Sequence, residues 1–392
     1  MSLGSKQFES LAQRGFTRRQ IGRIGALISA GAALPFYNEF AMAQQAQQGQ
    51  ARSGRGGGMR RQMDPDAVVI NQNENPMGPC QEGVDAIAKI APRGWRYNPG
   101  GEGDEFRPLA AAQLGVKPEY IWATAGSSDP LHASSCAFTS PTKSWVMANP
   151  GYGGGAPAFI GSKVVRVPLA DDFSHDVRAM LKADPDAGAY YICNPNNPTG
   201  TMTARKDIEF LLANKKKDAV VVVDEAYIHF ADLAQSVSDM VAADKDVVIL
   251  RTFSKIYGMA GLRAGFAAAR PDLLAKMRQF SGSNFLPVTA TACAAASMKV
   301  KNLIADRRGQ MTDIRNRTFA FLEKKGISFV PSQANFFMMD VKRPHDEFTQ
   351  ALAAQKVIVG RLWPIWPTHV RVTVGTQDEM NKFMAAVDKV WS

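Results

Sequence analysis

The clearest pattern in the chain is a series of short, uninterrupted apolar runs in its middle part. The runs cover residues 120–124, 145–148, 164–167, 190–193, 220–223 and 247–250. A strand with one exposed face alternates apolar and polar residues, whereas a strand buried on both faces is apolar throughout. Stretches compatible with helix, such as residues 175–182 and 205–217, separate several of the runs. The pattern predicts an α/β fold with a mostly parallel central sheet and helices on both of its faces.

The pattern changes after the first three-quarters of the chain. A long helical stretch covers residues 302–325, short strands follow it, and a last helix is expected over residues 377–390. This indicates a smaller α+β domain over residues 301–392. A chain of 392 residues is longer than one ordinary core requires, so two domains are expected. We assign residues 101–300 to the large domain and residues 65–100 to an N-terminal arm that forms part of the small domain.

The N-terminal segment has the order of an export signal. The pair Arg18-Arg19 precedes an apolar run at residues 24–36, and a small-x-small pattern ends at Ala43. This resembles a twin-arginine signal peptide over residues 1–43, cleaved at its end and lying outside the fold, which predicts a periplasmic protein. The run is too short for a transmembrane helix and no other stretch is long enough, so no stable membrane insertion is expected. The alternative is a tail whose arginine pair has no function.

Residues 44–64 are rich in Gln, Gly and Arg and are expected to be a flexible linker. The formal charge of +10 overstates the charge of the folded body. Nine of the 46 basic and two of the 36 acidic residues lie before residue 63, which leaves the body at about +3. No nucleic-acid-binding motif accompanies this charge, so nucleic acid is not expected as a partner. A mildly positive body still favours anionic small molecules.

The cysteines give no sign of a metal site. Cys80, Cys136, Cys193 and Cys293 are widely spaced, with no CxxC pair and no cluster with histidines. Export would permit a disulfide, but the spacing does not say which cysteines would pair. Cys136 and Cys193 lie in apolar surroundings and are expected in the core.

The candidate chemistry centres on residues 251–265. Lys255 follows the last apolar run beside Ser254, and Arg263 comes eight positions later. An aldehyde cofactor needs an amine for a Schiff base, which Lys255 can supply. A phosphate tail needs hydroxyl and guanidinium donors, which Ser254 and Arg263 can supply. The alternative is an ordinary solvated lysine.

Polar residues follow other predicted strands as well. Gly126, Ser127 and Ser128 open a helix after the first run, and their amides and hydroxyls suit a phosphate. Tyr152 follows the next run and can lie flat on an aromatic ring. Asn197 projects an amide from a proline-rich turn after the fourth run. Such residues are each commonly structural, but in α/β folds ligands bind beyond the carboxyl ends of the strands, where all of these residues lie.

A carboxylate and a phenol complete the set. Asp224 ends the run at residues 220–223, and Tyr227 follows three residues later. A carboxylate at the end of a buried strand is unfavourable without a cationic partner. A protonated pyridine nitrogen is such a partner, and Tyr227 can donate to a phenolate oxygen. With Lys255, these residues indicate an aldehyde cofactor that carries a pyridine ring and a phosphate.

At this point the sequence resembles the fold-type I pyridoxal-phosphate (PLP)-dependent transferases. Within them it is most similar to the class I/II aminotransferases of the histidinol-phosphate aminotransferase-like branch. The resemblance covers the chain from about residue 65 onward and rests on several motifs. These are Asn73-Glu74-Asn75-Pro76-Met77-Gly78-Pro79, Arg96-Tyr97-Asn98-Pro99-Gly100, Asn196-Asn197-Pro198-Thr199-Gly200, Asp224-Glu225-Ala226-Tyr227, Ser254-Lys255 through Arg263, and Arg371-Val372-Thr373-Val374-Gly375-Thr376. It implies pyridoxal 5'-phosphate as cofactor and ping-pong exchange of an amino group between an amino acid and a 2-oxo acid.

The resemblance also implies roles for the residues around the cofactor. Lys255 would form the Schiff base and move the proton during the reaction. Asp224 would keep the ring nitrogen protonated, and Asn197 and Tyr227 would bind the ring's 3-oxygen. Tyr152 would stack on the ring. The residues expected at the phosphate are Gly126, Ser127, Ser128, Ser254 and Arg263.

The remaining implied roles concern the substrate and a second subunit. Arg371 would bind the substrate α-carboxylate, with Asn75 and Arg361 also at the substrate. Tyr97 would reach the phosphate of the neighbouring subunit, which implies a homodimer with shared active sites.

Two stretches depart from the family pattern and leave the substrate open. Residues 151–155 are unusually rich in glycine, and residues 361–367 carry Trp363 and Trp366, which shape side-chain choice or pack the core. Export argues against histidine biosynthesis, whose phosphorylated intermediates are cytoplasmic. Another PLP-dependent Cα reaction (oxidation, elimination or decarboxylation) would use the same groups. A non-catalytic binding protein is disfavoured because both the lysine and the aspartate are present.

Overall fold

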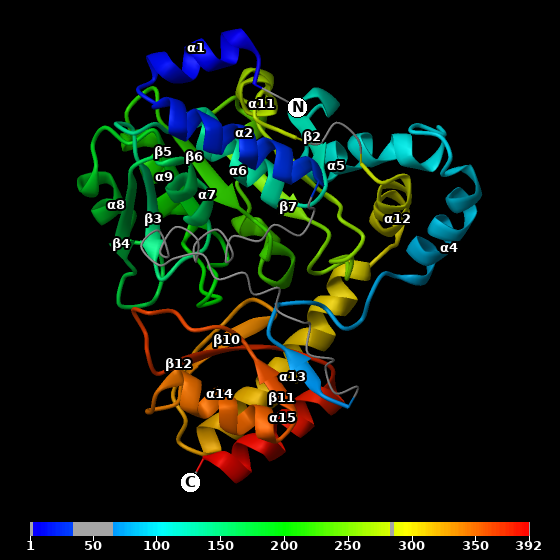
Figure 1. Cartoon of the computed structure of the whole chain (residues 1–392). Coiled ribbons are helices and arrows are strands. Elements are labelled where there is room, and N and C mark those ends of the chain that lie inside the picture. Colours follow the sequence, from blue (N-terminus) through cyan, green and yellow to red (C-terminus); the bar gives the residue numbers. More distant parts are fainter. Residues whose placement is uncertain (1–2, 34–65, 283–285, 392) are drawn as a thin grey trace.

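Two unequal parts make up the computed structural model, which describes residues 3–33, 66–282 and 286–391 (Figure 1). The larger part contains a seven-stranded sheet with the strand order β2-β8-β7-β6-β5-β3-β4. Its strands are β2 (Ile121–Thr124), β3 (Trp145–Asn149), β4 (Val164–Pro168), β5 (Ala189–Cys193), β6 (Val220–Asp224), β7 (Val247–Thr252) and β8 (Gly265–Ala268). All neighbours run parallel except β8, which is antiparallel to both β2 and β7. The prediction of a mostly parallel α/β sheet is confirmed.

Strand β8 is the one strand of the large sheet that the apolar pattern does not predict. It is four residues long and contains glycine and alanine instead of β-branched side chains. Gly265 opens it where three backbone segments converge. A Cβ there would lie 2.6 Å from the Gly126 carbonyl carbon and 2.8 Å from the Arg251 carbonyl oxygen. This glycine therefore lets the segment after β2 approach the end of β7, which carries the candidate lysine.

Helices cover both faces of the large sheet (Figure 1). The helices of the larger part are α4 (Gln81–Ile90), α5 (Phe106–Leu114), α6 (Ser128–Phe138), α7 (Gly155–Ile160), α8 (Val177–Ala183), α9 (Arg205–Asn214), α10 (Ser238–Ala242), α11 (Pro271–Arg278) and α12 (Val288–Lys299). Of these, α4 packs on α12 and lies to the side of the sheet. Short 3-10 turns lie at η1 (Ala91–Arg93), η2 (Glu102–Glu105), η3 (Pro118–Tyr120), η4 (Ile228–Phe230) and η5 (Leu233–Gln235). The helices α8 and α9 confirm the two helical stretches expected between the apolar runs.

The smaller part combines segments from near both ends of residues 66–391. A three-stranded antiparallel sheet has the order β12-β10-β9, and β1 pairs in parallel with β11. The strands are β1 (Val68–Ile70), β9 (Phe329–Val330), β10 (Phe336–Asp340), β11 (Val357–Val359) and β12 (His369–Thr373). The helices are α13 (Leu303–Lys324), α14 (His345–Ala354) and α15 (Gln377–Val390). Strand β1 belongs to the smaller part, so the chain that follows β1 crosses from the smaller part to the large domain.

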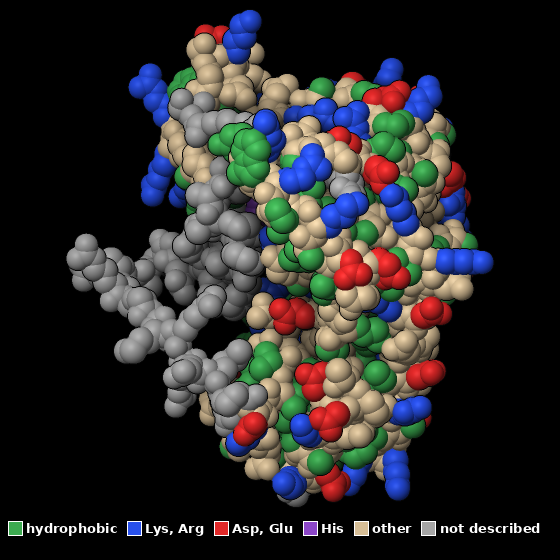
Figure 2. Space-filling view, turned by 90° about the vertical axis from the view of Figure 1, so that its right-hand side faces the viewer, with side chains coloured by type: hydrophobic (Ala, Val, Ile, Leu, Met, Phe, Trp, Pro, Cys, Tyr) green, Lys and Arg blue, Asp and Glu red, His purple; other side chains and the backbone are tan. Residues whose placement is uncertain are grey.

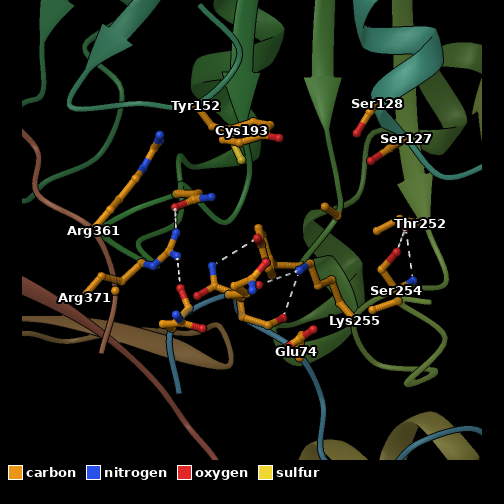
Figure 3. Close-up of a pocket in the computed structure, with 18 of the residues that line it drawn as sticks. Glu74, Ser127, Ser128, Tyr152, Cys193, Thr252, Ser254, Lys255, Arg361 and Arg371 are labelled. Atoms are coloured by element: carbon orange, nitrogen blue, oxygen red, sulfur yellow. Dashed lines mark hydrogen bonds between the residues drawn. The ribbon is translucent and has the colours of Figure 1, made fainter. Parts of the chain in front are cut away.

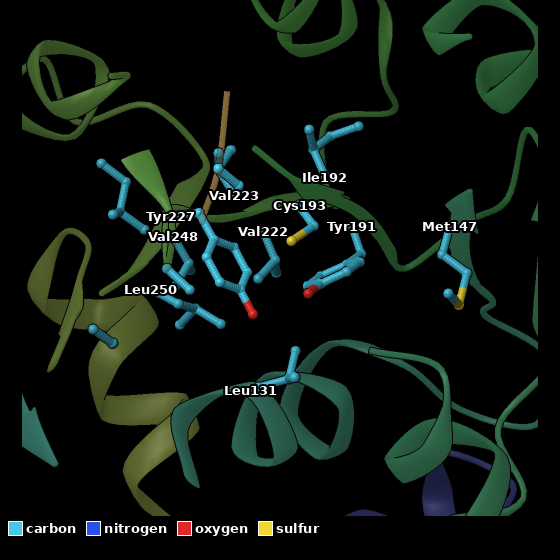
Figure 4. Close-up of a cluster of buried hydrophobic side chains, with 14 of the residues drawn as sticks. Leu131, Met147, Tyr191, Ile192, Cys193, Val222, Val223, Tyr227, Val248 and Leu250 are labelled. Atoms are coloured by element: carbon cyan, nitrogen blue, oxygen red, sulfur yellow. The ribbon is translucent and has the colours of Figure 1, made fainter. Parts of the chain in front are cut away.

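The central strands form the core of the large domain. Every residue of β5, β6 and β7 is buried, as expected for strands covered on both faces. Figure 4 shows Val222, Val248 and Leu250 from these strands in one cluster with Leu131 of α6. Each fully buried side chain of this kind stabilises the fold by about 1.5–3 kcal/mol relative to exposure. The core therefore gives rigid support to the residues that follow the carboxyl ends of β5, β6 and β7.

The N-terminal segment packs on the large domain. Helix α2 (Arg18–Ala33) runs beside α6 and α7, and α1 (Ser5–Gln13) packs on α2 (Figure 1). The segment buries Leu11, Phe16, Ile21, Ile24, Leu27 and Ile28. The expectation that this segment lies outside the fold is therefore wrong for residues 5–33. The reason is physical, because an apolar stripe typical of an export signal also fits a helix–helix interface.

Polar contacts also hold this segment in place. Arg14 donates to the carbonyl oxygens of Cys136 and Thr139 at the end of α6, and Gln20 donates to the Gly161 carbonyl at 3.1 Å. The cleavage pattern ending at Ala43 and the linker at residues 44–64 lie outside the described residues. Within the described ranges, no helix is long and apolar enough to cross a membrane.

The surface charges are mixed in sign, and the cysteines form no disulfide. On the face shown in Figure 2, basic and acidic side chains are interspersed over both parts of the molecule. All four cysteines are buried and free. In the part of the chain that the structure describes, no group of three or more His, Cys, Asp or Glu side chains is arranged to hold a metal ion.

Candidate active site

A cavity of about 820 Å³ lies where the carboxyl ends of the large sheet meet the small part (Figure 3). The topology places it there, because parallel strands all end at the same edge of a sheet. Eleven of the predicted site residues line it. They are Ser127, Ser128, Tyr152, Asn197, Asp224, Tyr227, Ser254, Lys255, Arg263, Arg361 and Arg371. Residues far apart in the sequence thus meet in one place.

Lys255 projects into the cavity from the loop after β7. Its Nζ donates to the carbonyl oxygens of Asn73 at 2.9 Å and Gln72 at 3.2 Å, both on the chain that follows β1. Burial lowers the pKa of Lys255 to about 8, and the positive charge of Arg371 adds to the effect. An amine with this pKa is partly neutral near neutral pH, so it can attack a carbonyl carbon.

Asp224 ends β6 at the floor of the cavity. Its Oδ2 accepts a hydrogen bond from the Tyr191 hydroxyl at 2.8 Å, and its Oδ1 accepts one from the Ala226 amide at 3.1 Å. The residue is 3% exposed, and no lysine or arginine of the described residues forms an ion pair with it. Burial raises the pKa of Asp224 to about 6, with the hydrogen bond from Tyr191 opposing the shift. A buried carboxylate of this kind is completed by a cationic ligand.

Arg371 reaches the cavity from β12. Its Nη1 donates to Asn197 Oδ1 at 2.9 Å and its Nη2 donates to the Asn71 carbonyl at 2.7 Å. Its Nε is buried without a hydrogen-bond partner. Burial lowers the pKa of Arg371 to about 10; Tyr227 opposes this shift and the nearby charge of Arg361 adds to it. The guanidinium therefore meets only neutral acceptors among the described residues and suits an anionic ligand.

Tyr227 and Asn197 present donors to the same cavity. The Tyr227 hydroxyl accepts a hydrogen bond from Asn73 Nδ2 at 3.2 Å, and its ring packs edge-to-face on Phe336 with a centroid distance of 4.8 Å. Burial raises the pKa of Tyr227, so the phenol keeps its own proton for donation. The Asn197 oxygen faces Arg371, which leaves the Asn197 amide group to donate elsewhere.

A third group of donors lies at the other end of the cavity. Arg263 Nη1 donates to Ser254 Oγ at 3.2 Å, and the Arg263 Nε is buried without a partner. Ser127 and Ser128 lie at the N-terminus of α6, a helix of 11 residues, where backbone amides and the helix dipole favour an anion. Position 126 beside this group has room only for glycine, because a Cβ there would lie 2.2 Å from Arg263 Nη2. Hydroxyls, a guanidinium and a helix N-terminus together suit a phosphate.

Three predicted residues do not line the cavity: Gly126, which lies next to it, and Asn75 and Tyr97. Asn75 is buried, but its side chain donates to the Ile256 carbonyl at 3.0 Å and accepts from the Met77 amide at 3.1 Å. It therefore braces the chain against the lysine loop, and its expected place at the substrate stays a prediction. Tyr97 is 83% exposed and lies outside the cavity of its own chain.

The sequence analysis missed residues that line the site or hold its side chains in place. Tyr191 holds Asp224, and its only signal was a phenol inside an otherwise apolar run. His345 lines the cavity and contacts the Gly360 carbonyl at 3.0 Å through Nε2, a contact that no local motif indicates. Trp363 does not line the cavity but packs with Val330 and Met338 in the small part, so its core role is the observed one.

The groups present fit pyridoxal phosphate. Lys255 offers an amine, and Asp224 offers a buried carboxylate without a cationic partner. At the phosphate corner, formed by Ser127, Ser128, Ser254 and Arg263, the Arg263 Nε has no hydrogen-bond partner. When bound, the cofactor supplies an aldehyde carbon for the amino group and a ring that stabilises negative charge on the substrate Cα.

The fold and this set of groups define a PLP-dependent enzyme of fold type I. The sequence matches the family described as aminotransferase class I and II over residues 65–387, and the chain belongs to that family. It is an aminotransferase, and nothing in the comparisons supports the alternative Cα reactions.

Individual relatives agree with this assignment. A histidinol-phosphate aminotransferase of Moorella thermoacetica is 30% identical over 333 residues, covering 83% of this chain and 86% of that protein. An aromatic amino acid aminotransferase of Cutibacterium acnes is 32% identical over 332 residues, covering 82% and 92%. The crystal structure of histidinol-phosphate aminotransferase from Sinorhizobium meliloti in complex with pyridoxal-5'-phosphate has the same fold. It superposes with a TM-score of 0.75 at 23% identity and covers 92% of this chain and 95% of that one.

Proposed function

We propose that this aminotransferase acts on amino acids whose side chains end in an anionic group and transfers their amino group to a 2-oxo acid by a ping-pong mechanism. In this proposal Arg371 holds the α-carboxylate and Arg361 meets the side chain. The observation that carries it is a pair of guanidinium groups on one wall of the cavity. Their Cζ atoms lie 4.5 Å (Arg361) and 5.2 Å (Arg371) from the same Trp363 ring centroid.

Each residue of the chain then has a distinct task. Lys255 Nζ takes the proton from the substrate Cα, for which a pKa of about 8 suits it near neutral pH. Asp224 would hold a proton on the ring nitrogen, and Asn197 and Tyr227 would bind the ring oxygen. The Tyr152 side chain lines the cavity beside Cys193 (Figure 3), where it would stack on the cofactor ring.

The charge of the cavity favours an anionic side chain over an aromatic one. After Arg371 has bound the α-carboxylate, Arg361 remains as a second positive group on the same wall. Among the relatives, histidinol-phosphate aminotransferase is named for a phosphorylated substrate and the aromatic amino acid aminotransferase for an aromatic one. The proposed export argues against a phosphorylated intermediate of a cytoplasmic pathway. The favoured class is therefore amino acids with a carboxylate or similar anionic end.

Replacing Arg361 with alanine tests this assignment. We expect kcat/KM for glutamate and aspartate to fall about 10- to 100-fold, because a charge-assisted hydrogen bond contributes about 1.5–3 kcal/mol. The values for alanine and phenylalanine should change less than about threefold. Steady-state kinetics on this panel measures both, and Arg317→Ala, which removes a surface arginine bonded to Gln377, is the matched control. An equal loss for all four amino acids would contradict a side-chain role for Arg361.

We further propose that the protein is exported by the twin-arginine route. Support comes from the order of the Arg18-Arg19 pair and the following apolar run, and from the exposure of both arginines on α2 while the apolar face of that helix is buried. An export receptor could therefore bind the arginines, but the apolar face must first leave its site on the large domain. The proposed location is the periplasm, with cleavage near Ala43.

Replacing Arg18 and Arg19 together with lysine is expected to leave the protein in the cytoplasm with its leader attached. A receptor that recognises two guanidinium forks does not accept ammonium groups in the same way. Cell fractionation with an N-terminal and a C-terminal tag measures location and cleavage, and Lys6→Arg serves as the control. Equal periplasmic yield from the double variant, or a wild-type protein that keeps its leader in the cytoplasm, would count against this route.

We also propose a homodimer in which Tyr97 reaches the phosphate corner of the partner subunit. Tyr97 and Trp95 are 83% and 75% exposed on one loop, which is unusual for large aromatic side chains on a monomer. Sedimentation equilibrium of the purified enzyme measures this directly, and a mass equal to that of one chain would refute the shared site.

A further inference from the structure

Among the described residues, one side chain donates a hydrogen bond to the Asp224 carboxylate, and it comes from the neighbouring strand. In the pairing of β5 with β6, Cys193 lies opposite Asp224, and Tyr191 lies two positions earlier on the same face of the sheet. The long phenol ring spans this offset, and its hydroxyl donates to Asp224 Oδ2 at 2.8 Å. The ring of Tyr191 lies in the buried cluster beside Cys193 and Val222 (Figure 4).

The Tyr191 ring is fixed from both sides. It is 1% exposed and stacks on Trp145, with ring centroids 5.4 Å apart and planes 28° from parallel. The glycine-rich loop closes over the ring, because a Cβ at Gly153 would lie 2.7 Å from two ring atoms. Gly153 also has a φ of +86°, which favours glycine. The unusual glycine content of residues 151–155 therefore has a packing reason, and the hydroxyl is held in one direction.

The other groups around Asp224 do not replace this contact. The Ala226 amide binds the second carboxylate oxygen, Oδ1. Lys255 favours the carboxylate form only through its charge at a distance, and the negative charge of Glu225 opposes that form. Glu225 forms a buried salt bridge with Arg251, in which Glu225 Oε2 lies 2.7 Å from Arg251 Nη2.

The ionisable neighbours Cys193 and Tyr227 complete the surroundings of Asp224. Burial raises the pKa of the Cys193 thiol and of the Tyr227 phenol, so both stay neutral beside the carboxylate. The Tyr191 hydroxyl also stays protonated, because burial and the adjacent carboxylate raise its pKa well above the ordinary value. Tyr191 is therefore a permanent donor, and Asp224 is the group whose charge it supports.

We propose that Tyr191 is a positioning residue that fixes Asp224 as a carboxylate aimed into the cavity, so that Asp224 keeps the cofactor ring nitrogen protonated. The inference rests on the proposed role of Asp224 at that nitrogen. A buried carboxylate tends to take up a proton, and a hydrogen bond to its charged form counteracts this tendency. Without the Tyr191 hydroxyl, Asp224 would shift toward its neutral form and hold the ring proton less strongly.

Replacing Tyr191 with phenylalanine removes one oxygen atom and leaves the stacked ring. The enzyme is reconstituted with pyridoxal phosphate labelled with nitrogen-15 in the ring, and the nitrogen resonance reports ring protonation directly. We expect the resonance of Tyr191→Phe to move toward the unprotonated position at a lower pH than that of the wild type. We also expect cofactor binding to weaken about tenfold, equal to about 1.4 kcal/mol.

The adjacent residue provides a matched control. Tyr190 is equally buried, and its hydroxyl donates to the Asp184 carbonyl at 3.2 Å, away from the cavity. Tyr190→Phe should lose similar stability on thermal unfolding of the holoenzyme but leave the nitrogen resonance and the cofactor affinity unchanged. A purely structural role for Tyr191 would make the two variants alike and would overturn the proposal.

A third variant separates failure of this inference from failure of its premise. Asp224→Ala should lose the ring proton, and if it does not, the role of Asp224 falls and the inference falls with it. If Asp224→Ala loses the proton while Tyr191→Phe keeps it at all pH values, only the inference about Tyr191 is wrong. Should Tyr191→Phe fail to fold, 3,5-difluorotyrosine placed at residue 191 preserves the shape and donates more strongly. It should retain the ring proton to a higher pH, and an unchanged profile would overturn the proposal.

Discussion

Lys255→Ala is expected to abolish covalent attachment of pyridoxal phosphate and to lower kcat by about 10²–10⁴-fold or more. General acid–base catalysis alone contributes a factor of about 10²–10⁴. The amine is the only lysine nitrogen that lines the described cavity. Its pKa of about 8 makes it both nucleophile and proton carrier. Borohydride reduction followed by mass spectrometry of the peptide that carries residue 255 measures attachment, and single-turnover kinetics measures the chemical step.

The fold of Lys255→Ala should survive. Among the described residues, Lys255 Nζ donates to the Gln72 and Asn73 carbonyl oxygens and lies 5.6 Å from the Tyr227 ring centroid, so the free energy of unfolding should change by no more than about 2 kcal/mol. Lys276→Ala removes an exposed lysine from α11 and should leave both attachment and turnover as in the wild type. Cofactor still trapped on the protein after Lys255→Ala would show that another amine forms the bond.

The strands and the residues at their ends were predictable because their physics is local. A run such as 220–223 can be buried on both faces only in a covered sheet, and a carboxylate at its end needs a partner whatever the rest of the chain does. Six of the seven strands in the large sheet follow from such runs. Strand β8 does not, because Gly265 is chosen by the close approach of Gly126 and Arg251 rather than by strand propensity.

The missing parts of the site depend on contacts between distant segments. Asn73 reaches the site because β1 pairs with β11, nearly 290 residues later in the chain, and no local pattern encodes that pairing. Tyr191 looked like an ordinary strand residue, since only the register of β5 against β6 shows that its hydroxyl faces Asp224. Motif spacing therefore located the residues that act on the cofactor but not those that hold them.

The N-terminal segment shows the same limit for apolar patterns. Ile24 and Leu27 are as suitable for an export signal as for a helix interface, and hydropathy does not distinguish the two. Only the large domain, which offers carbonyl oxygens to Arg14 and an apolar surface beside α7, makes the docked state available. If export occurs as proposed, the segment must exchange this surface for a receptor.

Arg371→Lys is expected to lower kcat/KM for amino acids by about 2–4 kcal/mol, or about 30- to 1000-fold. A guanidinium fork binds a carboxylate with two parallel hydrogen bonds, whereas an ammonium group offers a single point charge. The surroundings of Arg371 add to the loss. Burial and the nearby Arg361 already lower its pKa to about 10, and a lysine in the same place would hold its proton less firmly.

The change at Arg371 also reaches the cofactor side of the cavity. Arg371 also orients the Asn197 amide through a bond of 2.9 Å, so the contact to the ring oxygen should loosen while the phosphate corner around Arg263 stays intact. A substrate control separates the two effects. For an amine that lacks a carboxylate, Arg371→Lys should change kcat/KM less than about threefold, because no carboxylate contact is lost. If Arg371→Lys used amino acids with wild-type efficiency, the α-carboxylate would have to bind elsewhere, and Arg361 is the next guanidinium on the same wall.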